Sequence, residues 1–181
     1  SSQNKVVASL AARGVPIVAT SSDFKSNQIP QVMLDYVGGT QLLIDHLLKL
    51  GHRRIAYIAG RKGERHNQLR LEGYRMSLEK ADIPFDEDLV IYGEVTPGKG
   101  YEAMNHLLRL PKPPTAVFCL NNTNCMGVLR ALWEKAISIP REMSIVTYDD
   151  HDVCEYLSPP LTAVRPPRFN MGNRAAEILI K

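Results

Sequence analysis

The segment Thr115–Leu120 reads Thr-Ala-Val-Phe-Cys-Leu and is followed by Asn121-Asn-Thr-Asn124 and then by a helical pattern. A short and almost wholly apolar run is typical of a strand that is buried on both faces of a parallel sheet. A polar turn that leads from such a strand into a helix forms one half of a βαβ unit. The segment therefore predicts a parallel sheet that is covered by helices.

The same alternation extends in both directions along the chain. Six further runs have strand character: 15–20, 31–35, 54–59, 88–92, 143–148 and 161–165. Apolar residues recur at helical spacing between or beside them, over residues 5–13, 43–50, 71–81, 101–108, 126–136 and 171–178. We expect Gly51 to end the helix at 43–50 and Asn122 to cap the helix at 126–136. The pattern predicts an α/β fold with a parallel sheet and helices on both faces.

Composition indicates an ordinary globular protein. The chain has 181 residues, of which 44% are hydrophobic, and 22 Lys+Arg against 19 Asp+Glu give a net charge of +3. This charge is too small to indicate a nucleic-acid or membrane surface by itself. The three Cys include no Cys-x-x-Cys pair, which favours reduced thiols and a cytoplasmic location. No apolar run approaches the roughly 20 residues that cross a bilayer, and the first residues do not read as a signal peptide.

The regularity of the alternation suggests how the chain is divided. Strands and helices alternate without interruption from about residue 54 to 165, whereas only one helix and two strands precede this region. We expect a complete α/β unit over residues 36–165. Residues 1–35 and 166–181 then belong to a second and incomplete unit.

Polar residues follow the predicted strands at the points where a parallel sheet binds ligands, namely the carboxyl ends of its strands. These polar segments are 60–70, 93–97, 121–124 and 149–152. Arg, Asn and Asp side chains that converge on one edge suit a polyhydroxylated or heterocyclic small molecule. The alternative is that they are turn and cap residues, which is the usual role of Asn and Asp.

Sequence signatures of enzymes are missing. No Gly-x-Gly-x-x-Gly, phosphate-binding P-loop, Gly-x-Ser-x-Gly or His-Glu-x-x-His pattern occurs. The acidic tract 149–152 could suggest a divalent metal site, but consecutive residues point in different directions, and a helix start explains the tract better. We therefore expect neither catalysis, nor a cofactor, nor a metal.

Five stretches in this order and spacing resemble one known family: 50–60, 69–74, 114–118 with Asn121, 144–150 and 159–165. Together they are similar to the effector-binding domain of the lactose/galactose repressor (LacI/GalR) family of bacterial transcription regulators. The resemblance implies a periplasmic-binding-protein-like fold of two α/β subdomains with a small effector in the cleft. It makes 36–165 the C-terminal subdomain, 1–35 part of the N-terminal subdomain and 166–181 the return segment.

The resemblance also implies ligand-binding residues. Arg70 matches the arginine that grips the effector, Asn121 a polar contact and Asp149 an acidic contact. Glu64 and His66 lie where side chains that select the ligand often stand.

Two features bear on the kind of effector. Val95 stands where members of the family that this sequence resembles often carry an aromatic residue for stacking on the ligand, so a smaller or anionic effector such as a sugar phosphate becomes possible. An anionic effector would need cations beside Arg70 to point inward, and the candidates are Arg61, Lys62, Arg65 and Arg168. The alternative is that all of these except Arg70 are solvated surface charges.

Three functions compete. The first is the effector-binding and homodimerising domain of a cytoplasmic regulator that meets DNA only through a helix-turn-helix outside this chain and meets no membrane. Its dimer would use helices near 123–135 and 151–157, and exposure of Met126, Leu129 or Trp133 would support it, although core packing explains these residues equally. The second is a periplasmic sugar-binding protein, and the third is an enzyme. The Gly-His-Arg-Arg stretch at 51–54 and the unpaired Cys favour the regulator.

Overall fold

The computed structural model describes residues 2–20 and 29–180, which form two compact units. The larger, here called the core unit, is Tyr36–Arg165. The smaller, here called the terminal unit, combines Ser1–Asp35 with Pro166–Lys181.

The core unit is built on a parallel five-stranded sheet with the order β4-β3-β5-β6-β7. The strands are β3 (Ile55–Ile58), β4 (Val90–Ile91), β5 (Ala116–Cys119), β6 (Ser144–Tyr148) and β7 (Thr162–Val164). Each lies inside a run that the sequence predicts to be a strand. Ile58 pairs with Cys119 and Cys119 with Thr147, so the carboxyl ends of the three central strands share one edge.

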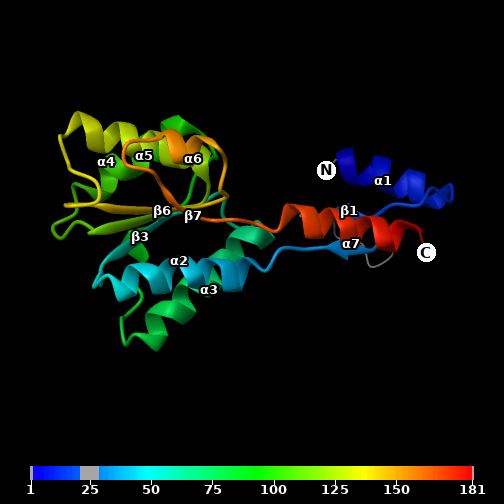
Figure 1. The fold of residues 1–181 in the computed structure, drawn as a ribbon, viewed down its shortest axis with the longest axis horizontal. Coiled ribbons are helices and arrows are strands. Elements are labelled where there is room, and N and C mark those ends of the chain that lie inside the picture. Colours follow the sequence, from blue (N-terminus) through cyan, green and yellow to red (C-terminus); the bar gives the residue numbers. More distant parts are fainter. Residues whose placement is uncertain (1, 21–28, 181) are drawn as a thin grey trace. The chain divides into compact units, whose positions relative to one another are not determined.

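Helices cover both faces of this sheet, as the sequence predicts (Figure 1). The helices are α2 (Tyr36–Lys49), α3 (Arg65–Lys80), α4 (Pro97–Leu107), α5 (Asn122–Glu134) and the short α6 (Val153–Tyr156), with a 3-10 turn η1 (Glu87–Leu89). Helices α2 and α3 lie on one face and α4 and α5 on the other (Figure 1). Strand residues alternate between them: the Tyr57 ring lies 6.0 Å from that of Tyr74 in α3, whereas Ile58 packs with Met104 of α4.

The helix ends confirm one expected cap and correct another. Gly51 follows α2 in the left-handed conformation that favours glycine, with φ of +92°. The cap of α5 is Asn121 rather than Asn122, because Asn121 has the extended backbone of a cap and its side chain accepts from the N–H of Asn124. Asn122 is the first helical residue, and its Oδ1 accepts from the hydroxyl of Thr147 at 3.2 Å.

The apolar stripe at 126–136 is divided: Leu129 is half-buried against the core, whereas Met126 and Trp133 lie on the outer side of α5. Met126 is 39% exposed and Trp133 is 75% exposed, whereas Val128 and Leu132 are fully buried. The helix touches both the sheet and α4, and these contacts turn residues 124–125, 127–128 and 131–132 inward. Core packing therefore does not explain Met126 and Trp133.

Helices α4 and α5 approach each other at two glycines. A Cβ on Gly127 would lie 1.8 Å from the carbonyl oxygen of Pro97, and one on Gly100 would lie 2.0 Å from that of Asn124. Both obstacles are backbone atoms, which cannot rotate away. The two helix backbones are thus in direct contact.

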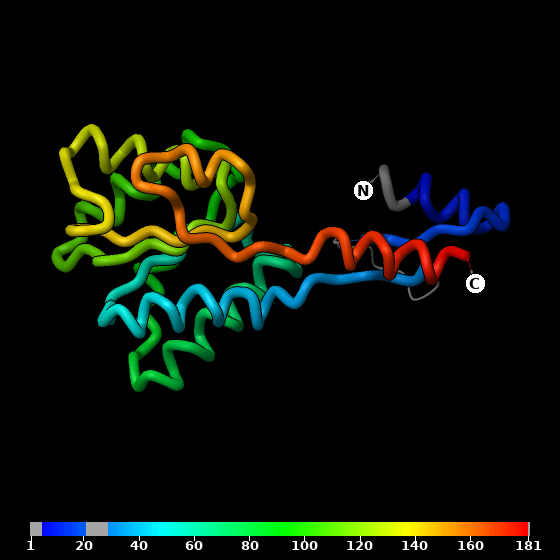
Figure 2. The backbone as a smooth tube through the Cα atoms, viewed as in Figure 1, coloured from blue at the N-terminus to red at the C-terminus, as the bar shows by residue number. Residues whose placement is uncertain are grey.

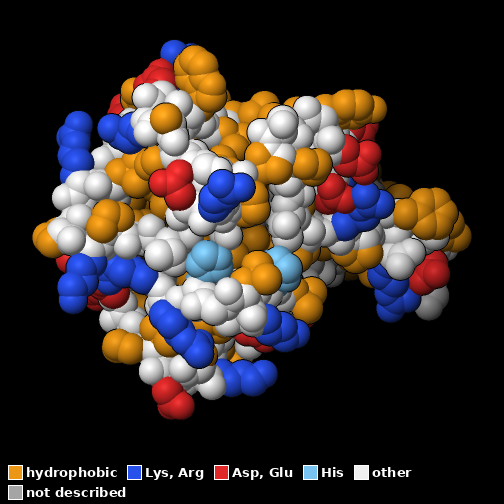
Figure 3. Space-filling model, turned by 60° about the vertical axis from the view of Figure 1, so that its left-hand side comes forward, with side chains coloured by type: hydrophobic (Ala, Val, Ile, Leu, Met, Phe, Trp, Pro, Cys, Tyr) orange, Lys and Arg blue, Asp and Glu red, His pale blue; other side chains and the backbone are white. Residues whose placement is uncertain are grey.

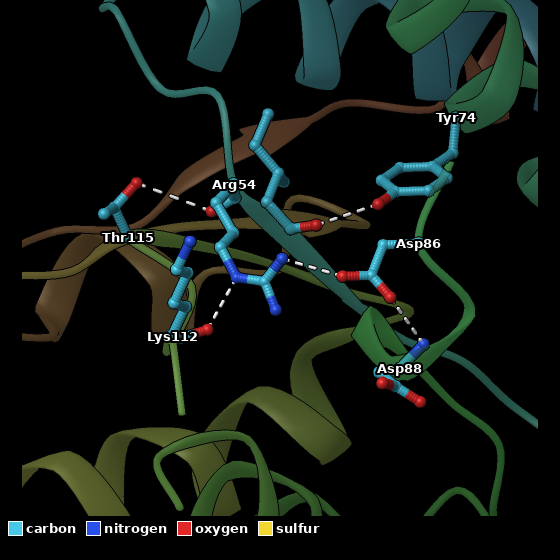
Figure 4. A network of polar contacts seen from close by, with 7 residues as sticks. Arg54, Tyr74, Asp86, Asp88, Lys112 and Thr115 are labelled. Carbon is cyan, nitrogen blue, oxygen red and sulfur yellow. Dashed lines mark hydrogen bonds and ion pairs between the residues drawn. The ribbon is translucent and has the colours of Figure 1, made fainter. Parts of the chain in front are cut away.

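The Gly-His-Arg-Arg stretch at 51–54 forms hydrogen bonds with residues near the first residues of neighbouring strands, at the amino edge of the sheet. Arg54 donates to the carbonyl oxygen of Lys112 at 2.6 Å and to the carboxylate of Asp86 at 2.7 Å (Figure 4). The two ring nitrogens of His52 each lie 2.9 Å from a hydroxyl, those of Thr115 and Ser144. These contacts give the motif a structural role away from the carboxyl edge.

Asp86→Asn is expected to destabilise the protein most at neutral pH. Hydrogen bonding from Arg54 lowers the pKa of the Asp86 carboxyl below its ordinary value, so its contribution to stability is present above about pH 4 and is lost as pH falls through the lowered pKa. Asn retains an oxygen that can accept from the N–H of Asp88, as Asp86 does. Urea unfolding should show a larger difference between wild type and variant at about pH 7 than at about pH 3; equal differences would contradict the assignment.

The terminal unit brings together segments from opposite ends of the chain. Its elements are α1 (Ser2–Ala12), β1 (Ala19–Thr20), β2 (Gln31–Val32) and α7 (Arg168–Ile180). Strands β1 and β2 are parallel, and α7 packs beside both of them (Figure 2). Met171, Ala175 and Ile178 are the half-buried positions of α7, as their spacing predicts.

Candidate functional site

Arg70 is the buried cation at the carboxyl edge of the core sheet. It lies on α3 and is only 6% exposed. Its guanidinium carbon lies 4.3 Å from the ring centroid of Tyr36, which begins α2, and 4.5 Å from that of Tyr148, which ends β6. Two aromatic faces therefore hold the guanidinium by cation–π contact, and three elements of the fold fix its position.

The hydrogen-bonding capacity of Arg70 is largely unused. One terminal nitrogen donates a long bond of 3.4 Å to the carbonyl oxygen of His66, and Nε has no partner. Among the described residues, no carboxylate forms an ion pair with Arg70. A buried charge that is only partly hydrogen-bonded costs free energy, so this arrangement is typical of a group that binds a ligand.

Glu64 and His66 stand at the start of the same helix. Glu64 occupies the cap position of α3 but makes no cap hydrogen bond with its side chain. Its Oε2 instead accepts from Nδ2 of Asn67 at 3.1 Å and lies 3.2 Å from Nε2 of His66. The His66 ring contacts that of Tyr36, with centroids 6.2 Å apart. The residues Glu64, His66 and Arg70 are thus joined through Tyr36 and one turn of α3.

Asn121 and Asp149 follow the next two strands at this edge. Asn121 comes after β5, and its Oδ1 is engaged in capping α5. Asp149 comes directly after Tyr148 and has φ of +69°, a left-handed conformation that costs about 1 kcal/mol for a residue other than glycine. Strained backbone of this kind clusters at functional sites.

The side chains of the acidic tract at 149–152 do not come together at one site. Asp150 pairs with Arg165, and α6 begins at Val153. In the part of the chain that the structure describes, no three His, Cys, Asp or Glu side chains are placed to hold a metal ion.

Two of the basic residues near the first strand, Arg61 and Lys62, make their contacts at the surface. Arg61 is exposed and pairs with Glu94 at 2.9 Å, and Lys62 is exposed above the ring of Tyr92. Arg168 is exposed at the start of α7 in the terminal unit, and Val95 is 39% exposed between β4 and α4. On the face drawn in Figure 3, Lys and Arg side chains are spread among other types rather than gathered in one patch. The interpretation of Arg61 and Lys62 as surface charges is therefore favoured.

Sequence reasoning missed the two tyrosines that hold Arg70. Tyr148 had a usable signal, because it is the last residue of a buried strand at the ligand edge. Tyr36 had none, since a helix start does not reveal what its side chain touches. A Cβ on Gly39 would lie 2.2 Å from the hydroxyl oxygen of Tyr148, so this glycine leaves room for the ring.

A parallel α/β unit whose carboxyl edge presents a buried arginine, an amide and carboxylates defines the class of small-molecule-binding α/β domains. Residues 44–181 match the family described as periplasmic binding protein-like domain, and the chain belongs to this family. Within it, the relatives that follow identify the chain as an effector-binding domain of the LacI/GalR family of regulators.

Three relatives illustrate the match. The HTH-type transcriptional repressor PurR of Actinobacillus pleuropneumoniae serotype 3 (strain JL03) is 34% identical over 172 residues, which are 87% of this chain and 51% of the repressor. A regulatory protein of the LacI family from Chloroflexus aggregans has 32% identity and a TM-score of 0.86, covering 96% of this chain and 63% of that one. A LacI family transcriptional regulator from Enterococcus faecium with bound ribose has 31% identity and a TM-score of 0.86, covering 97% and 65%.

These relatives confirm the family and the fold that the sequence resemblance implies. They are transcriptional regulators rather than enzymes, and they favour the regulator over the periplasmic transport protein. The chain spans about half the length of the curated relatives it matches. None of the helices in the described ranges is long and apolar enough to cross a membrane.

Proposed function

We propose that this chain is the effector-binding and dimerising part of a cytoplasmic, DNA-binding transcriptional regulator without catalytic activity. The observation that carries the proposal is the buried Arg70 guanidinium, which contacts two tyrosine rings and has few hydrogen bonds within the described residues. A planar guanidinium can offer two parallel donors to neighbouring hydroxyls or to a carboxylate.

The other residues at this edge favour a neutral, hydroxyl-rich effector. Glu64 and Asp149 bring two carboxylates to balance the single buried cation, and carboxylates accept from hydroxyl groups. The Oδ1 of Asn121 is used by the helix cap, which leaves its NH2 group to donate to the effector. His66 and the aliphatic Val95 would set the size of the ligand. A monosaccharide fits this set, and ribose is the ligand bound to the Enterococcus faecium relative.

Control of DNA binding would follow from movement between subdomains. In this proposal the core unit is the C-terminal subdomain, and the terminal unit belongs to the N-terminal one. An effector that prefers one degree of closure shifts the balance between two states and so changes the affinity of a helix-turn-helix elsewhere in the protein. The coupling is reciprocal, so DNA would change the affinity for effector by the same factor.

Calorimetric titration with ribose, glucose, galacturonate, ribose 5-phosphate and guanine tests the proposed effector class. We expect saturable binding of at least one neutral monosaccharide, with little change between low and high salt because the ligand is uncharged. Binding of ribose 5-phosphate alone would contradict the neutral effector. Binding of none of these compounds would count against a sugar receptor.

The dimer would form through the outer face of α5 and the segment after it. Trp133 is 75% exposed and Tyr156 is 83% exposed. A groove of about 380 Å³ lies beside Trp133 and is lined by Leu129, Ile139 and Leu157. An exposed apolar patch with a groove beside it is typical of a protein–protein interface. A twofold axis at this face would place Trp133 of each copy against the same face of the other copy.

Trp133→Glu is expected to convert a dimer into a monomer. A Trp at the centre of an interface commonly contributes about 2 kcal/mol or more, and a buried Glu adds a desolvation cost, so the dimer should weaken by about 100-fold or more. Sedimentation equilibrium measures the change. Leu42→Glu is the matched control, because Leu42 is 68% exposed on α2, on the opposite face of the sheet. A dimer that survives Trp133→Glu unchanged would exclude this face.

A further inference from the structure

A second groove lies along the outer side of α3, next to the edge strand β4. Its volume is about 570 Å³, which is within the range of small-molecule sites. Its lining includes Lys62, Leu71, Arg75, Phe85 and Tyr92. Arg70 does not line this groove. The groove is therefore separate from the buried guanidinium of the candidate effector site.

Two cations in the groove are each placed over an aromatic ring. The Lys62 Nζ lies 5.7 Å from the ring centroid of Tyr92, and the Arg75 guanidinium carbon lies 4.0 Å from that of Phe85. The ring of Phe85 is itself anchored edge-on against Tyr74, with centroids 6.1 Å apart. Neither cation forms an ion pair with a residue that the structure describes. The rings therefore hold two positive charges at the groove without neutralising them.

The remaining lining gives the groove a mixed character. Leu71 and Val90 supply apolar surface, and Glu87 is the one acidic residue of the lining. Two cations against one carboxylate leave a net positive charge. A ligand that satisfies both features has an anionic group to meet the cations and a flat, apolar body to cover the aromatic and aliphatic surface.

A buried amide also lines the groove. Asn67 is 2% exposed, lines the groove, and its Oδ1 makes no hydrogen bond. Its Nδ2 donates to the carboxylate of Glu64 at the candidate effector site. A single side chain thus belongs to both places, with one of its polar atoms still unsatisfied.

We propose that this groove is a second ligand site, selective for small aromatic anions such as aryl phosphates or aryl carboxylates. The site is distinct from the one that binds the effector. It stands whether or not the sugar proposal holds, because no residue that defines its charge belongs to the effector site.

Phenyl phosphate is the probe, with inorganic phosphate and phenol as its two halves. Titration with phenyl phosphate should give saturable changes in amide chemical shifts in two-dimensional NMR. The Kd should be about 1 mM, which is the affinity expected of so small a ligand. The shifts should centre on Gly63, Gln68 and Tyr92. Either half alone should bind at least about tenfold more weakly.

Arg75→Glu should abolish the saturable shifts, since it reverses a charge that holds the anion. Arg109→Glu is the control, because Arg109 is exposed beyond α4 and does not line the groove. Retained binding in Arg75→Glu would overturn the proposal. Equal binding of inorganic phosphate, shifts confined to Asn121 and Asp149, or no saturable shift would each overturn it as well.

Discussion

Arg70→Met is expected to abolish effector binding while leaving the protein as stable as before or more stable. A buried guanidinium that donates two charge-assisted bonds contributes several kcal/mol to binding, so affinity should fall by about 100-fold or more. The fold should not suffer, because the variant removes a buried charge with no carboxylate partner among the described residues. Replacement of such charges by apolar side chains is often neutral or stabilising, by up to about 4 kcal/mol.

A loss of effector binding without a loss of stability in Arg70→Met would distinguish a ligand-binding role of Arg70 from a structural role. Calorimetry with the sugar that binds the wild type gives the affinity, and urea unfolding without ligand gives the stability. Arg75→Met is the matched control, since Arg75 lies on the same helix and also over an aromatic ring, but is exposed. Arg70→Lys should bind almost as poorly as Arg70→Met, because an ammonium cannot present two parallel donors. Wild-type affinity in Arg70→Met, or a large loss of stability, would show that Arg70 serves the fold.

Gly127→Ala is expected to cause the largest loss of stability of any single methyl addition considered. The added Cβ would meet the Pro97 carbonyl oxygen at 1.8 Å and the backbone nitrogen of Tyr101 at 2.5 Å. These atoms belong to a packed helix, so α4 and α5 must separate. Overpacking of this kind costs about 3 kcal/mol or more, well above the roughly 1 kcal/mol that Ala gains over Gly in a helix.

Gly98→Ala provides the control within the same pair of helices. Gly98 lies on α4, and a Cβ there meets nothing within 4 Å. This variant should be unchanged or up to about 1 kcal/mol more stable in urea unfolding. If Gly127→Ala matched it, the close backbone contact between α4 and α5 would be wrong.

Most strands and helices of the core unit could be predicted from the sequence. The strand runs 54–59, 115–120 and 143–148 contain β3, β5 and β6, because strands buried on both faces are rich in apolar residues. The residues at the carboxyl ends of these strands followed from topology, since parallel strands end at the same edge. The roles of Arg70, Asn121 and Asp149 came instead from family resemblance and stay a proposal.

The predictions that were wrong concern α5, namely its cap residue and its buried side. Both depend on contacts with residues that are distant in the chain. Two adjacent asparagines have the same preference for a helix cap, and the contact of Asn122 with Thr147 on β6 belongs to the fold rather than to local sequence. The apolar stripe on α5 looked like any helix face. The positions of the sheet and of α4 decide which side of α5 is buried.

The sequence by itself determined the order of strands and helices and the edge at which polar residues collect, because periodicity and chain direction are local properties. Tertiary structure decided which cation is buried, since Arg61, Lys62 and Arg70 are chemically alike along the chain. Burial of Arg70 results from rings supplied by Tyr36 and Tyr148, 34 residues before it and 78 residues after it. Desolvation depends on what surrounds a side chain in space, and only the packed sheet and helices set those surroundings.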